Sequence, residues 1–203
     1  MKIVLVRHGQ SEANSMGVLQ GHMDSPLTSQ GRLQAIELAQ RMILMGYISF
    51  DRIYSSDLVR AAETATIIGK KLKINDINYT PLLREMDLGI YVGRKWDQLQ
   101  PKERLFFESI SNDHSKQIPN GESINSLVKR LQQFLNEVGN LEPPPSLVLV
   151  ITHGGPLNHL LRTILDLLPE TDEWFENCKM TEIEWLQRQT WRLLSFNEKK
   201  IDS

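Results

Sequence analysis

Residues 3–9 read Ile-Val-Leu-Val-Arg-His-Gly, and residues 147–154 read Leu-Val-Leu-Val-Ile-Thr-His-Gly. In both stretches an uninterrupted aliphatic run is followed by one polar residue, then by a histidine and a glycine. Continuous aliphatic runs rich in β-branched residues are typical of central strands that are buried on both faces of a sheet. The two stretches therefore predict two central strands that end at His8 and His153.

The rest of the chain alternates between strand-like and helix-like patterns. Further strands are predicted at residues 50–54, 181–186 and 191–196, the last two as a pair. Apolar residues at helical spacing predict helices over residues 35–43, 58–72, 124–135 and 157–165. Thr28 or Ser29 is available to cap the first of these helices. This alternation favours an α/β fold, a three-layer α/β/α sandwich around a mainly parallel sheet.

The length of 203 residues suits a single domain that spans residues 1–203. The least patterned stretch is about residues 90–120, where mixed charge surrounds Trp96, Phe106 and Phe107. We expect a small helical insertion or a lid there. Three consecutive prolines at 143–145 come directly before a predicted strand, so they indicate a stiff connection rather than a domain boundary.

The composition narrows the class of protein. Hydrophobic residues make up 40% and charged residues 24%, which is ordinary for a folded globular chain and excludes wholesale disorder. A net charge of -2 excludes a generally basic nucleic-acid-binding protein, and no run reaches the roughly 18 apolar residues of a membrane span. The only cysteine, Cys178, allows no internal disulfide. We expect a cytoplasmic protein without nucleic-acid or membrane partners, either a monomer or a homodimer.

The strand ends carry the residues with chemical potential. Ligands of open α/β sheets bind at the carboxyl ends of the strands, so His8 and His153 would share one crevice if their strands are neighbours. The glycines that follow, including Gly154, let the backbone approach a ligand, and helix openings direct free N–H groups at an anion. Arg7 and Arg60 are suited to forked contacts with a phosphate group.

A phosphoryl-transfer mechanism accounts for these residue types. A neutral histidine is a plausible nucleophile toward phosphorus, and a second histidine can stabilise charge in the transition state. Glu85, in a loop after another short strand, supplies a carboxyl that can protonate the leaving oxygen. Each residue alone has an ordinary structural explanation, such as a solvated arginine or a surface carboxylate. The combination, in this order and at the ends of these elements, is the informative signal.

This pattern resembles the histidine phosphatase superfamily, also called phosphoglycerate-mutase-like. The matching residues run through nearly the whole chain: Arg7-His8-Gly9, Asn14, Gln20-Gly21, Asp24 to Thr28, Gly31, Ser55-Ser56-Asp57, Arg60, Thr64-Ala65, Leu83-Arg84-Glu85, Gly89, Gly121-Glu122-Ser123, Arg130 and Thr152 to Gly155. The resemblance implies that His8 is the phosphorylated nucleophile, that Arg7, Arg60 and His153 complete the phosphate pocket, and that Glu85 is the proton donor. It places Asn14, Gln20 and Gly21 around the bound group and requires neither a metal nor another cofactor.

The expected reaction is metal-independent hydrolysis of a small phosphomonoester through a phosphohistidine. A cofactor-dependent phosphoglycerate mutase is the alternative, but mutases that resemble this chain carry a longer segment where only 35 residues separate Glu85 from Gly121. A non-catalytic module that binds phosphorylated ligands is a third hypothesis, although it predicts loss of the nucleophile or donor, and both are present. The substrate stays open, because residues 90–93 lack the aromatic-Glu-Gly element of many such phosphatases.

Three further side chains have structural interpretations. His22 beside Asp24 is interpreted as part of a polar loop rather than as a metal ligand. Cys178 has no histidine or basic cluster near it in the sequence and is interpreted as inert. Ser123, just before a predicted helix, either caps that helix or reaches the substrate.

Overall fold

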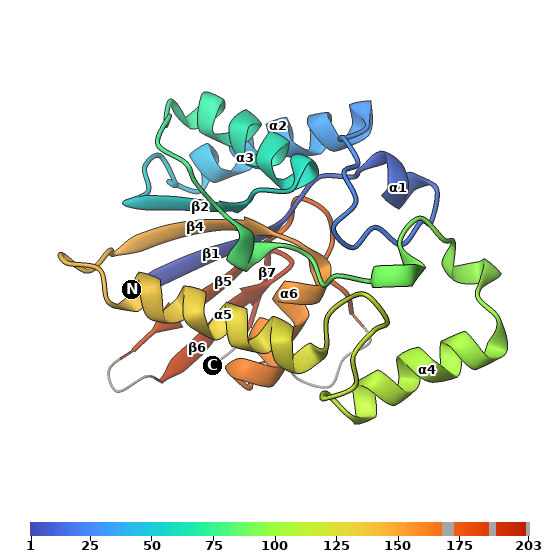
Figure 1. The fold of residues 1–203 in the computed structure, drawn as a ribbon. Helices are drawn as coiled ribbons and strands as arrows, with labels where there is room; N and C mark the ends of the chain where they lie inside the picture. Colours follow the sequence, from blue (N-terminus) through green and yellow to red (C-terminus); the bar gives the residue numbers. More distant parts are fainter. Residues whose placement is uncertain (168–172, 187–189, 202–203) are drawn as a thin grey trace.

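The computed structural model describes residues 1–167, 173–186 and 190–201 (Figure 1). Its centre is a seven-stranded sheet in the order β3-β2-β4-β1-β5-β6-β7. Four neighbouring strands pair in parallel: β3 (Asn78–Thr80), β2 (Arg52–Ser56), β4 (Leu147–Thr152) and β1 (Lys2–Arg7). The other three pair antiparallel: β5 (Met180–Trp185), β6 (Trp191–Phe196) and β7 (Lys199–Lys200). The sheet is thus mixed, with its parallel part at the centre and on one side.

The two strands predicted from the aliphatic runs are direct neighbours. In the β1–β4 register Val6 pairs with Ile151 and Arg7 with Thr152. The ladder continues one step further, because the backbone N–H of His8 donates to the carbonyl of Thr152 at 3.0 Å. This pairing meets the condition under which the two histidines share one crevice.

Both faces of the sheet are buried, as the aliphatic runs predict. Along β1, Ile3 and Leu5 pack on one face, whereas Val4 and Val6 pack on the other. Because successive side chains of a strand point to opposite faces, each run contributes to two separate cores. This explains why β1 shows no alternation between apolar and polar residues.

Helices cover the two faces and form the expected three layers (Figure 1). α2 (Ser29–Leu44) and α3 (Val59–Leu72) lie on one face. α5 (Ile124–Gly139) and α6 (Gly154–His159), which continues into a π-helical turn at Leu160–Ile164, lie on the other. The Thr28 hydroxyl caps α2 by accepting a hydrogen bond from the N–H of Gly31 at 2.9 Å. Of the two predicted caps, Thr28 is therefore the one used.

Several boundaries differ from the sequence-based expectation, and β2 is one example. β2 begins at Arg52 and not at residue 50, and it continues to Ser56. The prolines at 143–145 connect α5 to β4 as expected.

Residues 90–120 contain little regular structure besides one helix. The segment holds most of η2 (Gly89–Tyr91), then η3 (Trp96–Gln98) and α4 (Pro101–Asn112), which extends to one side in Figure 1. Its aromatic side chains pack on one another, with Phe107 at 4.9 Å from Tyr91 and 5.3 Å from Trp96 between ring centroids. Backbone hydrogen bonds from Leu19 to Arg94 and from Gly93 to Leu19 tie the segment to the rest of the chain. Its aromatic residues thus form a small local core.

The short elements near the strand ends complete the fold. They are α1 (Glu12–Ser15), between β1 and α2, and η1 (Pro81–Leu83), which follows β3. Among the described residues, none of the helices combines the length and apolar character needed to cross a membrane.

Candidate active site

The two histidines lie side by side at the carboxyl ends of β1 and β4. Their ring centroids are 5.0 Å apart, with the ring planes at 62°. The exposed fraction is 2% for His8 and 0% for His153. The structure therefore brings together the pair that the two aliphatic runs predicted.

His8 is oriented by its own backbone. Its Nδ1 lies 2.7 Å from the carbonyl oxygen of Gly9. Because a carbonyl oxygen only accepts, Nδ1 carries the proton and the lone pair is on Nε2. The Gly9 N–H in turn donates to the hydroxyl of Thr64 at 3.0 Å, which fixes this turn against α3. In this orientation Nε2 of His8 has no hydrogen-bond partner among the described residues and can present its lone pair to a ligand.

His153 is oriented by a side chain from another strand. Its Nε2 lies 2.8 Å from the hydroxyl oxygen of Ser56 at the end of β2. That hydroxyl also accepts the N–H of Leu58 at 3.3 Å. A hydroxyl can both donate and accept, so this contact is compatible with a ring proton on Nδ1 of His153. Nδ1 is buried and has no hydrogen-bond partner within the described part of the chain.

Two arginines complete the group. Arg60, in the first turn of α3, is 1% exposed and donates to the carbonyls of Met23 and Gly21, each at 2.9 Å. Arg7, at the end of β1, donates from Nη1 to the carbonyl of Phe175 at 2.7 Å. The Nε atoms of both arginines are buried without a partner among residues 1–167, 173–186 and 190–201. Buried N–H groups are rarely left without an acceptor, so these donors are suited to an anion.

Burial controls the protonation of this group. Desolvation, reinforced by the positive charges of Arg60 and Arg7, lowers the pKa of His8 well below its usual value. Burial likewise lowers the pKa of His153, with smaller contributions from Arg60 and His8. The pKa of Arg60 falls to about 10 through burial, partly offset by Glu85 and Asp24, so Arg60 stays charged at neutral pH. The site therefore combines two neutral imidazoles with two cationic guanidinium groups.

Glu85 reaches this group from the loop after η1. Its Oε1 accepts the N–H of Met86 at 2.8 Å, and its Oε2 accepts the N–H of Gly155 at 3.3 Å, two residues after His153. Both arginines interact electrostatically with its carboxylate. The side chain is held at the start of α6, where a carboxyl can exchange a proton with a ligand of the pocket.

The predicted phosphate-binding residues have identifiable local roles. The side-chain amide oxygen Oδ1 of Asn14 accepts the backbone N–H of Ser11 at 3.2 Å and completes the cap of α1. Gln20 is buried and accepts the Ser11 hydroxyl at 2.8 Å. Gly21, at φ +48, offers its carbonyl to Arg60, so it helps to position that guanidinium. Direct contact of these residues with a phosphate group stays a prediction.

Gly154 is the first residue of α6 and Pro156 is the third, so the helix begins earlier than the residue 157 expected from the apolar spacing. The first four N–H groups of a helix have no acceptor within the helix, so a proline at the third position, which lacks an N–H, costs no hydrogen bond. Gly154 also marks a close approach, since a Cβ there would lie 2.9 Å from Nε1 of Trp174.

Three contributors were missed in the sequence. The Asn177 side chain donates to the carbonyl of His8 at 2.7 Å, and the Phe175 carbonyl holds Arg7. Trp174, 54% exposed, lies against Gly154. All three precede β5, which pairs with β1 on the side opposite to β4. Nothing in their local sequence marks them, because their role follows from strand order alone.

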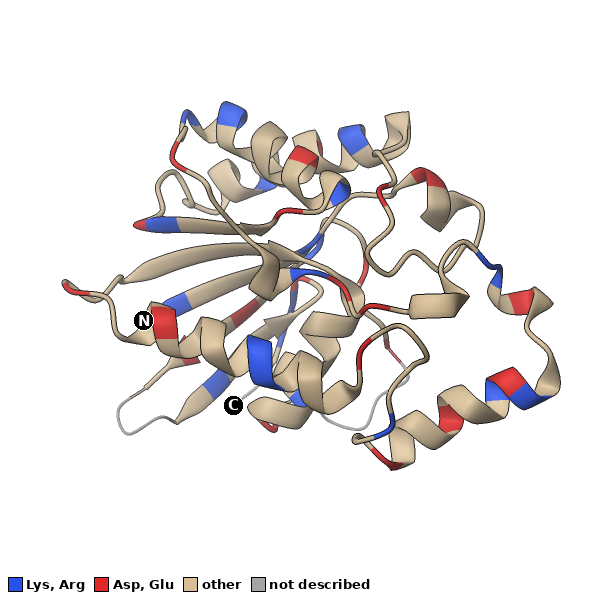
Figure 2. Ribbon diagram, in the orientation of Figure 1, with Lys and Arg blue, Asp and Glu red and all other residues tan. Residues whose placement is uncertain are grey.

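The other singled-out residues have structural roles. Cys178 is buried, and burial raises the pKa of its thiol to about 12, which disfavours the reactive thiolate. Ser123 caps α5 by accepting the N–H of Ser126 at 3.1 Å. Within the described residues, no three His, Cys, Asp or Glu side chains gather as a metal site would require. Figure 2 shows basic and acidic residues intermixed across the ribbon, so the site draws its positive charge from a few buried side chains.

Comparison with known proteins agrees with this geometry. Residues 3–199 match the family model described as "Histidine phosphatase superfamily (branch 1)". The chain is 35% identical over 190 residues to a "Probable phosphoglycerate mutase GpmB" of Cronobacter sakazakii, covering 92% of this chain and 86% of that protein. It is 36% identical to the protein of the same name from Proteus mirabilis, covering 94% and 87%.

Solved structures resemble the fold over its full length. A putative alpha-ribazole-5'-P phosphatase from Escherichia coli has a TM-score of 0.81 at 26% identity and covers 100% of both chains. A mycobacterial glucosyl-3-phosphoglycerate phosphatase in complex with VO3 has a TM-score of 0.80 at 28% identity and covers 97% of this chain and 98% of that chain. The chain therefore belongs to branch 1 of the histidine phosphatase superfamily and is an enzyme of the histidine-phosphatase type.

Proposed function

We propose that this chain hydrolyses a small phosphorylated metabolite without a metal, through a phosphohistidine at His8. The observation that carries the proposal is the buried group of nitrogen atoms at the strand ends. A neutral His8 with a free Nε2 lies beside His153 and among the charges of Arg7 and Arg60. A phosphomonoester would offer its anionic oxygens to those donors and its phosphorus to the nucleophile.

The first step transfers the phosphoryl group to the enzyme. Nε2 of His8 attacks phosphorus, the N–P bond forms, and the bond from phosphorus to the ester oxygen breaks. Glu85, in its carboxylic acid form, gives its proton to the leaving oxygen, so that the free alcohol departs. The guanidinium groups and Nδ1–H of His153 stabilise the charge on the phosphoryl oxygens during transfer.

The second step returns the enzyme to its starting state. The Glu85 carboxylate now takes a proton from a water molecule, whose oxygen attacks the phosphorus of phospho-His8. The N–P bond breaks, inorganic phosphate leaves, and His8 is again neutral with its lone pair on Nε2. Microscopic reversibility makes one carboxyl both the acid and the base. We further propose that Asn14, Gln20, Gly21 and Gly154 surround the phosphate or its ester oxygen.

The decisive experiment varies the leaving group. Glu85→Gln should slow hydrolysis of glycerol 2-phosphate by about 100-fold or more, because an alkoxide needs a proton to leave. The same change should alter hydrolysis of p-nitrophenyl phosphate far less, since p-nitrophenolate leaves unprotonated. Equal slowing of both esters would contradict the donor role. Turnover by the wild type should persist in EDTA, and loss of turnover there would contradict metal independence.

A mutase reaction is the second candidate, because the curated relatives at 35–36% identity are named probable phosphoglycerate mutases. In that reaction the phosphoenzyme returns its group to a bound sugar acid in place of water. Only 35 residues separate Glu85 from Gly121, which favours a pocket open to water. 3-Phosphoglycerate with a bisphosphoglycerate primer should release phosphate. Conversion to 2-phosphoglycerate faster than phosphate release would favour the mutase.

The natural substrate requires a screen. The named neighbours act on alpha-ribazole-5'-P and on glucosyl-3-phosphoglycerate. We propose a small phosphomonoester, and a phosphate-release screen over sugar phosphates, phosphoglycerates, phosphoserine and alpha-ribazole-5'-P tests this. A phospho-ligand binding module without catalysis would turn over none of these esters.

A further inference from the structure

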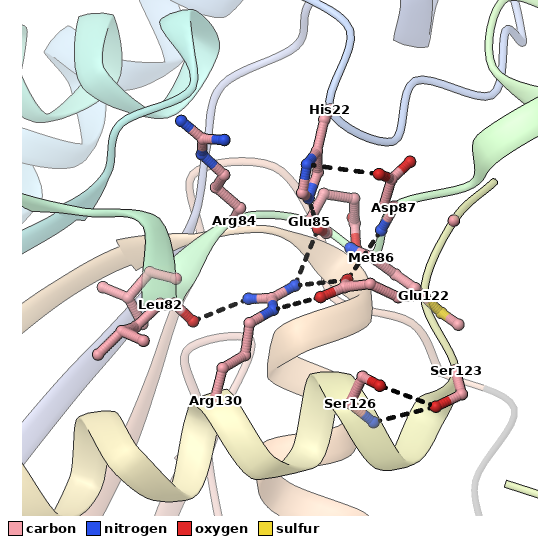
Figure 3. Close-up of polar contacts among 12 residues, drawn as sticks. His22, Leu82, Arg84, Glu85, Met86, Asp87, Glu122, Ser123, Ser126 and Arg130 are labelled. Carbon is pink, nitrogen blue, oxygen red and sulfur yellow. Dashed lines mark hydrogen bonds and ion pairs between the residues drawn. The ribbon is translucent and has the colours of Figure 1, made fainter. Parts of the chain in front are cut away.

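The backbone carbonyl of Glu85 receives hydrogen bonds from two distant segments (Figure 3). Nε2 of His22, in the loop between α1 and α2, lies 2.7 Å from this oxygen. Nη2 of Arg130, in α5, donates to the same oxygen at 2.9 Å. A carbonyl oxygen has two lone pairs, and both are used here. Residues 63 and 45 positions away in sequence thus fix the backbone at Glu85.

Arg130 is itself fixed on three sides. Its Nε and Nη2 donate to the two carboxylate oxygens of Glu122 at 2.9 and 3.1 Å, and its Nη1 donates to the carbonyl of Leu82 at 2.8 Å. Glu122 also accepts the N–H of Asp87 at 2.9 Å. Burial opposes ionisation of Glu122, but hydrogen bonding and charge from Arg130 lower its pKa overall. Arg130 and Glu122 therefore bind the backbone both before and after Glu85, at Leu82 and at Asp87.

His22 holds the same segment from the opposite side. Its Nδ1 lies 3.8 Å from a carboxylate oxygen of Asp87, two residues after Glu85. Figure 3 shows His22 and Arg130 approaching Glu85 from different elements, with Asp87 and Glu122 beside them. The loop residue interpreted from sequence as merely polar thus contacts the proposed proton donor.

The carboxyl group of Glu85 is tightly packed. A Cβ on Gly155 would lie 2.3 Å from Oε1 of Glu85, so the carboxyl is packed against the start of α6. Its position is determined by that contact at one end and by its own backbone at the other. In active sites a displacement of about 1 Å can cost about 100-fold in rate. A displacement of the Glu85 backbone would therefore also displace its carboxyl group.

We propose that His22 and Arg130 are positioning residues for the proton donor, acting through the Glu85 carbonyl. The inference rests on the proposed function and deepens it. It separates two parts of the site. His8 attacks phosphorus while His153 and the arginines stabilise the phosphoryl charge. The contacts to the Glu85 carbonyl determine how well the leaving oxygen is protonated. Loss of these contacts should therefore impair esters in proportion to their need for a proton.

The first test replaces His22. In His22→Leu, kcat/KM for glycerol 2-phosphate should fall about 10-fold, whereas that for p-nitrophenyl phosphate should stay within about twofold. His22→Gln should recover most of the loss, because its amide N–H can donate to the same carbonyl. His114→Leu replaces a histidine of the 90–120 segment and should change both esters by the same factor.

The second test removes the Arg130–Glu122 pair together. Arg130→Met alone would leave a half-buried carboxylate unpaired and risks unfolding, so it is combined with Glu122→Gln, which still accepts the Asp87 N–H. The double variant should lose about 10- to 100-fold on the alkyl ester alone. Arg41→Met with Glu198→Gln is the matched control, because Arg41 also pairs with a glutamate and donates to a backbone carbonyl, that of Cys178.

The outcomes separate the inference from the proposed function. Leaving-group-selective loss in both tests supports the positioning role. Equal loss on both esters, or no loss, in folded His22 and Arg130 variants overturns it, provided that Glu85→Gln is itself selective. If Glu85→Gln is not selective, the donor role of Glu85 fails first and the inference falls with it. Thermal unfolding monitored by circular dichroism establishes that each variant is folded.

Discussion

The ends of β1 and β4 carry the same local pattern, an aliphatic strand followed by histidine and glycine, yet they hold their histidines differently. His8 is oriented by the backbone carbonyl of the next residue, Gly9, whereas His153 is oriented by the hydroxyl of Ser56, which stands at the end of a third strand. A carbonyl fixes the tautomer by itself, because it only accepts. A hydroxyl both donates and accepts, so the Ser56 contact orients the His153 ring without fixing its tautomer.

This difference matches the proposed roles. A nucleophile that is phosphorylated and released needs a free Nε2 in every turnover, and a backbone acceptor on Nδ1 provides it. A histidine that stabilises the transition state needs a proton directed at the phosphoryl oxygens, and a hydroxyl on its other nitrogen is compatible with that. In the proposed mechanism the same short motif would therefore serve two functions, with a different partner for each ring.

The largest expected effect comes from replacing each of the two histidines separately. His8→Ala should reduce turnover by more than about 1,000-fold and abolish acid-labile phosphorylation of the protein. His153→Ala should still be phosphorylated, but about 100- to 1,000-fold more slowly. Rapid-quench labelling measures both. A persistent label in His8→Ala would show that another residue is the nucleophile.

The glycines after the histidines should differ in tolerance. A Cβ at Gly9 would lie 2.5 Å from the carbonyl oxygen of Gly31, which is backbone of α2 and cannot move aside. Gly9→Ala should therefore lower the free energy of unfolding by about 1–3 kcal/mol. A Cβ at Gly154 would meet only the exposed Trp174 side chain, so Gly154→Ala should cost less than about 1 kcal/mol. Urea unfolding compares them, and equal costs would contradict this distinction.

Removing the Ser56 hydroxyl tests how His153 is held. Ser56→Ala should lower kcat by about 10-fold, because the imidazole loses the contact that orients its ring. Ser55→Ala is the control, since the Ser55 hydroxyl is also buried but donates to the Ser56 carbonyl. Steady-state kinetics with p-nitrophenyl phosphate suffices. The prediction is wrong if the two variants lose activity alike.

Burial is what the two histidines share, and it predicts a common pH effect. Their folded-state pKa values lie well below 6.5, so between pH 7.5 and 5.5 the unfolded chain binds protons that the folded chain does not. The free energy of unfolding should therefore decrease as the pH is lowered from 7.5 to 5.5, by about 1 kcal/mol for each histidine. His159, with its pKa lowered to about 4 by burial, acts in the same direction.

Urea unfolding at the two pH values checks this effect. His8→Gln and His153→Gln should each reduce the difference in unfolding free energy between pH 7.5 and 5.5 by a similar amount. A reduction in only one of these variants would show that burial is not the shared cause.

Much of the site could be predicted because its main residues stand at the ends of elements. The aliphatic runs identify β1 and β4, and a histidine follows each run after one intervening residue. Arg60 follows a strand end and opens a helix in the same way. The position of Glu85 in a loop after a short strand suggested its role, and family resemblance then suggested roles for Asn14, Gln20 and Gly21, which no periodicity marks. The function of residues 90–120 was not predictable, since that segment packs on itself by contacts without regular spacing.

The sequence by itself determined the two buried strands, the helices that cover them, a cap at Thr28 or Ser29 and the chemical types available at the strand ends. These depend on side-chain periodicity and on hydrogen bonds over a few residues, which are local properties. Only the tertiary structure decided which nitrogen of His8 is free, that Asn177 holds its carbonyl, and that His22 contacts Glu85. Those contacts join residues far apart in the chain, and they exist only once strand order has placed β5 beside β1 and packing has brought the loops together.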